Sequence, residues 1–108
     1  MPYKPNEMMR KAAQTALDYN DTVAPSKRWG TPKGLQRARK IALGKEFDRD
    51  EIAQIAGFLS RFEKDYERQR ASKKYGKGYY AYMGWGGPSG LAWARDKLKR
   101  YEQKKSRY

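Results

Sequence analysis

The stretch at residues 79–94 reads YYAYMGWGGPSGLAWA, and it consists of two aromatic, uncharged segments joined by a cluster of glycines. The first segment, Tyr79–Trp85, is too short to be a stable helix alone, so we expect it to be helical only where neighbours bury it. Gly86 and Gly87 can take a positive φ at little cost, which would end this segment and reverse the chain. Pro88 suits the start of a helix because its missing N–H would be unpaired there. The stretch predicts a helix, a tight turn and a second helix.

Large aromatic rings flank this turn on both sides. Glycines beside an indole usually let two backbones approach closely while the ring covers the gap, which predicts a structural corner. The competing interpretation is a phosphate cradle at a helix N-terminus. That signal is weak, because no Lys-Ser/Thr follows and the GxGxxG register is absent. The expected members of the corner are Trp85, Gly86, Gly87, Pro88, Gly90 and Trp93.

The turn and an upstream block resemble a group of small tailed-phage proteins and C-terminal phage domains. These carry a Gly-x-x-Arg-Ala-Arg block, a helix, a Trp-Gly-Gly-x-x-Gly turn and a basic helix with Trp-Ala. This chain departs from them by its tyrosines before the turn and by Pro88-Ser89, where they often have Asp-Ala. The group has no settled activity, so the resemblance implies a phage origin rather than a mechanism. It covers about residues 34–99, through Gly34, Arg37, Ala38, Arg39, Gly44, Phe58, Arg61, Phe62, Trp85, Gly86, Gly87, Gly90, Trp93 and Ala94.

The composition predicts one small domain whose core relies on aromatic residues. The chain has 108 residues, of which 38% are hydrophobic, with three Trp, nine Tyr and three Phe. A chain of this length is expected to form a single domain, here residues 1–108. Val, Ile and Leu are scarce, so aromatic rings, Ala and Met must supply much of the core.

Catalysis, cofactors and metals are not expected. The chain contains no His and no Cys, so the commonest general base and the thiol nucleophile are missing. Asp48, Asp50 and Glu51 could offer oxygen ligands to a hard cation, but their spacing lacks the Gly and the downstream Glu of a calcium loop. Helix capping is the favoured role for these carboxylates, and we expect a protein that is not an enzyme.

Boundary signals predict an all-α fold of four or five short helices with the glycine-rich corner packed on the third helix. Asn6, Thr31 and Asp48 are expected N-caps, and Asp48 with Glu51 forms a capping box. Gly44 is expected to end the second helix. The expected helices are Glu7–Tyr19, Pro32–Leu43, one from Asp48 to about Arg70, Tyr79–Trp85 and Pro88–Gln103, with loops at 20–30 and 71–78 and frayed tails at 1–5 and 104–108.

The net charge of +13 predicts a polyanionic partner. No acid occurs from Val23 to Lys45 or from Arg68 to Gly78. The alternative that requires no partner is a basic face that only aids solubility. Tyrosines at 75, 79, 80 and 82 beside lysines resemble a surface that stacks bases, although half of them are expected to face the core. The candidate binding residues are Lys33, Arg37, Arg39, Lys40, Arg68, Arg70, Lys73, Lys74, Lys77, Arg95 and Lys99.

The leading hypothesis is a basic, non-enzymatic phage protein that contacts nucleic acid through its phosphates. One alternative is a virion component that docks on acidic capsid, portal or neck subunits or on packaged DNA. Another is an inhibitor of an acidic host protein. No apolar run is long enough for a membrane span or a signal peptide, so we expect no membrane partner and a location in the host cytoplasm or the virion.

Overall fold

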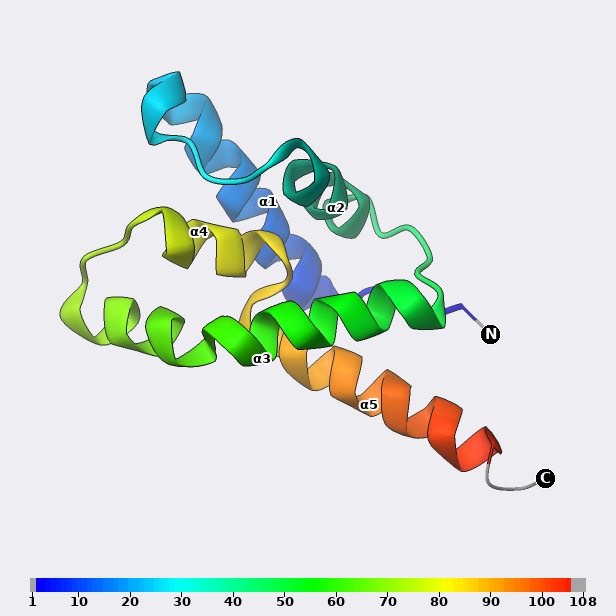
Figure 1. Cartoon of the computed structure of the whole chain (residues 1–108). Helices are drawn as coiled ribbons and strands as arrows, with labels where there is room; N and C mark the ends of the chain where they lie inside the picture. The colour runs from blue at the N-terminus through cyan, green and yellow to red at the C-terminus, as the bar shows by residue number, and fades with distance from the viewer. Residues whose placement is uncertain (1, 106–108) are drawn as a thin grey trace.

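The computed structural model describes residues 2–105 as a single all-α globule, which confirms the expected fold class. The part of the expected C-terminal tail at 106–108 lies outside the described residues. The long dimension of the molecule is 52 Å, and the other two are 26 and 21 Å. The elements are α1 (Glu7–Thr22), the 3₁₀ helix η1 (Pro25–Lys27), α2 (Pro32–Ala42), α3 (Arg49–Ser72), α4 (Lys77–Gly84) and α5 (Gly87–Lys105) (Figure 1).

The predicted N-caps are confirmed. The Asn6 side chain accepts a hydrogen bond from the Met9 amide at 2.9 Å, and the Thr31 hydroxyl accepts one from the Gly34 amide at 3.1 Å. At α3, Asp48 and Glu51 exchange bonds of 2.8 and 3.1 Å between side chain and backbone, which completes the capping box. Local sequence therefore determines where α1, α2 and α3 begin.

The glycine-rich corner joins α4 to α5 as expected. Gly86 and Gly87 have φ values of +113° and +66°, a region that side chains disfavour, and Pro88 lies in the first turn of α5. Trp85 stacks on Phe58 of α3, with ring centroids 4.2 Å apart and planes 12° from parallel. The predicted packing of this corner on the third helix is therefore present.

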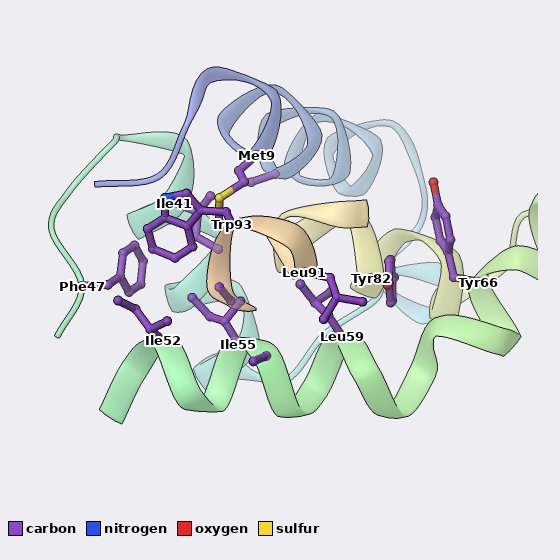
Figure 2. Close-up of a cluster of buried hydrophobic side chains, with 13 residues drawn as sticks. Met9, Ile41, Phe47, Ile52, Ile55, Leu59, Tyr66, Tyr82, Leu91 and Trp93 are labelled. Atoms are coloured by element: carbon purple, nitrogen blue, oxygen red, sulfur yellow. The ribbon is translucent and has the colours of Figure 1, made fainter. Parts of the chain in front are cut away.

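The main core lies along α3, which packs on α5 and α4 (Figure 2). Ile52, Ile55 and Leu59 are fully buried on α3, and Tyr66 continues this face toward the end of the helix. Phe62, whose spacing from Leu59 and Tyr66 matches the same face of a helix, is 36% exposed. The buried face of α3 is thus narrower than the spacing of its apolar residues suggests.

The expected loop at 20–30 is more ordered than its composition indicates. α1 continues to Thr22, and Trp29 inserts its indole into a second core cluster at 1% exposure. The Trp29 indole donates to the Ala16 carbonyl at 2.8 Å, and the Asn20 side chain bonds both the Trp29 amide and its carbonyl at 3.1 Å. Any side chain at Gly84 would overlap the Trp29 ring. A glycine in α4 thus makes room for this tryptophan.

The N-terminal residues expected to fray are held against the core. Tyr3 and Phe47 exchange backbone hydrogen bonds of 3.0 and 2.8 Å, and the Trp93 indole donates to the Lys4 carbonyl at 3.0 Å. Pro5 is buried. These bonds attach residues 2–5 to the start of α3 and to α5.

The expected connector at 71–78 is reduced to a four-residue bend, because α3 continues to Ser72 and α4 begins at Lys77. Lys73 caps α3 in the left-handed region with a φ of +58°. The Gln69 side chain accepts a hydrogen bond from the Gly76 amide at 2.9 Å. We call these four residues, 73–76, together with Lys77 at the start of α4, the α3–α4 bend.

Candidate nucleic-acid interface

Two of the four candidate cations of α2 do not face solvent freely. Arg37 donates to the Glu51 carbonyl at 3.3 Å and to the Gln54 side chain at 2.8 Å. Its guanidinium lies 5.3 Å from the centroid of the Trp85 ring. The Lys40 ammonium lies 2.5 Å from a Glu51 carboxylate oxygen and 4.4 Å from the centroid of the Phe47 ring. Arg37 and Lys40 therefore join α2 to the first turns of α3.

Ionisation around Glu51 reflects this internal role. Burial raises the pKa of the Glu51 carboxyl, but hydrogen bonds from Lys40 and the Asp48 amide, with the charges of Lys40 and Arg37, lower that pKa overall. Burial lowers the pKa of Arg37, and the carboxylates of Glu51 and Asp48 oppose this shift. Glu51 is thus held ionised between two cations.

Two other predicted cations of α2 remain available. Lys33 and Arg39 are exposed, and neither forms an ion pair with any acid of the described chain. Lys33 lines one hollow with Arg37 and Lys40. Only half of the predicted binding residues of α2 are therefore free to meet a partner.

A group of exposed cations lies at one end of the part of the chain that the structure describes. Arg70, Lys73, Lys74 and Lys77 surround the α3–α4 bend, where the chain turns at the left of Figure 1. All four side chains are exposed, and among residues 2–105 none of them pairs with a carboxylate. Arg68, also predicted, pairs with Asp65 at 3.1 Å on the exposed surface of α3.

The predicted cations of α5 are not part of this group. Arg95 is exposed and donates to the Ser60 hydroxyl at 3.2 Å, which links α5 to the middle of α3. Lys99 is exposed on the segment of α5 that leads to the opposite end of the molecule from the α3–α4 bend (Figure 1). The fold therefore distributes the predicted cations over more than one surface.

Most of the tyrosines that resembled a base-stacking surface pack on one another. Tyr79 stacks on Tyr66 with centroids 5.1 Å apart, and Tyr80 stacks on Tyr19 at 3.6 Å. Tyr82 is buried, and burial with the nearby Glu63 raises its pKa to about 12. Tyr75, at 44% exposure, is the most open of the four predicted tyrosines.

Other aromatic rings line a groove between α2, α3 and α4. One hollow is lined by residues that include Arg28, Phe58, Lys77 and Trp85, and the next by residues that include Phe58 and Phe62. The two hollows share Phe58 and Ala81, so they lie next to each other on the surface. Phe62 lies at a tilt to Phe58, with centroids 4.9 Å apart. We define the aromatic groove by Arg28, Phe58, Phe62, Lys77, Ala81 and Trp85.

Sequence reasoning missed Arg28, Phe58 and Phe62 as surface candidates. Phe58 and Phe62 are four residues apart on α3, a spacing that places them on one side of a helix. This four-residue spacing of two phenylalanines was the available signal. Nothing local indicated that Arg28 would meet this line, because it lies in the segment that precedes α2.

Comparison with known proteins found no family model, curated protein or solved structure that matches this chain. The resemblance to tailed-phage proteins therefore stays a prediction. Within residues 2–105, no cluster of three or more carboxylates is placed to hold a metal ion. None of the described helices is long and apolar enough to cross a membrane.

Proposed function

We propose that this protein is a small, non-enzymatic nucleic-acid-binding protein that contacts phosphates through the cations around the α3–α4 bend. The observation that carries the proposal is a set of four exposed cations that form no ion pair with the carboxylates of residues 2–105: Arg70, Lys73, Lys74 and Lys77. Like charges so close together repel one another, and an anionic partner would relieve that repulsion. A tailed-phage setting is proposed from the sequence resemblance alone.

If the protein binds phosphates, the clustering of its Lys and Arg residues matters more for affinity than its total charge. Each Lys or Arg that neutralises a phosphate releases condensed counterions, so affinity depends steeply on salt and only weakly on sequence. Lys33 and Arg39 on α2 add free charge to the same molecule. Arg37 and Lys40 contribute less in this proposal, because they already bind groups of α3.

The test measures binding to duplex DNA of several sequences by fluorescence anisotropy over a series of salt concentrations. The variant replaces Lys73, Lys74 and Lys77 by Gln, and the control replaces the same lysines by Arg to keep the charge. We expect similar affinity for every sequence and a log–log salt slope that shrinks by about 0.9 for each lost phosphate contact. The Arg control should bind as the unmodified protein does. An affinity that is independent of salt contradicts the proposal.

The alternatives use the same cations on an acidic protein. A virion component or an inhibitor of an acidic host protein would require carboxylates arranged on a folded surface, and neither would need DNA. If the three Gln substitutions leave DNA affinity unchanged, phosphate binding at the α3–α4 bend is wrong. Incorporation of the protein into purified phage particles at a fixed ratio would then favour the virion component.

A further inference from the structure

The aromatic groove has an apolar floor and basic sides. Its floor holds Phe58, stacked on Trp85, and Phe62, which remains 36% exposed. Arg28 and Lys77 lie beside this floor, and both side chains are exposed. An exposed phenylalanine normally favours burial against a partner. Rings next to cations therefore point to a ligand that is flat, apolar on its faces and linked to negative charge.

We infer that the aromatic groove binds unpaired nucleobases, so that the preferred nucleic acid is single-stranded. This inference rests on the proposed function and extends it by naming the form of nucleic acid. Every base has a flat face that stacks on an aromatic ring, and such stacking tolerates sequence. In a duplex those faces are covered by neighbouring base pairs, so only a single strand can offer them to Phe62.

The groove continues into the phosphate-binding surface. Lys77 lines the groove and also belongs to the α3–α4 bend with Lys73 and Lys74. A strand whose bases enter the groove can therefore place its phosphates on Lys77 and the neighbouring cations. The groove contains one carboxylate, Asp65, and this carboxylate pairs with Arg68 at 3.1 Å. The charge around the floor favours an anionic ligand.

The size of the groove also fits this ligand. Its two hollows have volumes of about 380 and 280 Å³. Pockets that hold small organic molecules run from roughly 300 to 1,000 Å³. The first hollow is therefore at the lower end of that range and the second is just below it, which suits a base or a nucleoside rather than a helix of a partner protein.

Three probes separate stacking from simple charge attraction: a single-stranded oligonucleotide, the duplex of the same sequence, and inorganic polyphosphate, which carries no bases. Trp85 lies in the groove, whereas Trp29 and Trp93 are 1% and 6% exposed. We expect the single strand to bind more tightly than the duplex and to quench tryptophan fluorescence. Polyphosphate should bind without this quenching.

Phe62→Ala tests the floor directly. Base–aromatic stacking predicts a loss of roughly 5- to 150-fold in single-strand affinity, with little change for duplex or polyphosphate. Phe62→Leu retains apolar bulk but removes the ring, so it should show a similar loss even if the Ala variant proves unstable. Leu43→Ala is the matched control, because Leu43 is 65% exposed and outside the groove. Circular dichroism and thermal melting report whether each variant folds.

The outcomes distinguish this inference from the proposed function. Equal affinity for single strand and duplex, without quenching, overturns the groove as a base site and leaves phosphate binding intact. A loss with Tyr75→Ala but not with Phe62→Ala moves stacking to the α3–α4 bend and also overturns the groove. Failure of all three probes to bind contradicts the proposed function itself. Single-strand preference lost in both Phe62 variants supports the inference.

Discussion

The second helix and the α3–α4 bend are both rich in Lys and Arg, yet the fold uses their charges differently. In α2, Arg37 and Lys40 bind the first turns of α3, where Glu51 accepts from Lys40 and Arg37 reaches the Glu51 carbonyl. At the bend, Lys73 and Lys74 are exposed and have no acidic partner in the described chain. The same residue types therefore stabilise the fold at one place and remain free for a partner at the other.

The difference arises from what lies opposite each segment. The N-terminal turn of α3 is acidic because carboxylates favour the positive end of a helix dipole and cap its free amides. The side chains of Arg37 and Lys40 extend from α2 to that turn, where they meet Glu51. The α3–α4 bend lies at the far end of α3, where cations suit the negative end of the dipole, and Lys73 and Lys74 form no ion pair with any carboxylate among residues 2–105. A free basic cluster is thus a stronger sign of an external partner than basic composition alone.

Trp85→Ala should have the largest effect on stability, because it removes the ring that stacks on Phe58 and contacts the Arg37 guanidinium. We expect a loss of about 3 kcal/mol in the free energy of unfolding, the low end of the range for removing a large packed aromatic ring, because Trp85 is half-buried. Tyr75→Ala at the α3–α4 bend is the control and should cost less than about 1 kcal/mol. Urea denaturation followed by circular dichroism measures both. Equal stability of the two variants would show that the α2–α3 contact does not depend on Trp85.

Paired charge substitutions sharpen the comparison between the two basic segments. Replacing Arg37 and Lys40 by Gln should lower the free energy of unfolding by about 2 kcal/mol, since it removes hydrogen bonds to Glu51 and Gln54. Replacing Lys73 and Lys74 by Gln should change stability by less than about 0.5 kcal/mol. Binding to DNA should show the reverse order of effects. The distinction between the segments is wrong if both double variants lose stability alike.

The contributions of the two segments to the stability of the protein should also depend differently on pH. The pKa of Glu51 is lower in the folded protein than its usual value of 4.5. Its contribution to stability is therefore complete above that value and is lost as the pH falls through the lowered pKa. Glu51→Gln should flatten the acid side of the curve of melting temperature against pH. Lys73→Gln should retain the shape of the original curve, and a flattened curve there would contradict a role for Glu51.

The smallest expected effect concerns the backbone of the α3–α4 bend. Lys73 has a φ of +58°, a backbone conformation that is higher in energy for a residue with a side chain than for glycine. Lys73→Gly should therefore stabilise the protein by up to about 0.5 kcal/mol, after the larger entropy of the unfolded glycine chain is included. Lys74→Gly is the matched control and should destabilise it, because Lys74 has no positive φ. Thermal melting compares the two, and a loss of stability in both would show that the cap at Lys73 is not strained.

Local sequence determined the helical starts and the corner. Caps at Asn6, Thr31 and Asp48 act over three residues, and the positive φ of Gly86 and Gly87 is a property of glycine itself. The three- and four-residue spacing of Ile52, Ile55 and Leu59 puts them on one face of a helix, and all three are buried on α3. These features depend on neighbours along the chain, so one sequence is enough to find them.

Tertiary structure alone decided which basic and aromatic residues remain available. Arg37 became half-buried because its side chain reaches the Glu51 carbonyl, and Trp29 became core because α4 offers Gly84 at the point of contact. Phe62 became a surface ring although its spacing matches the core stripe, since neighbouring helices cover only part of α3. These outcomes depend on contacts between residues distant in sequence. No local propensity or charge pattern records which helix will lie opposite.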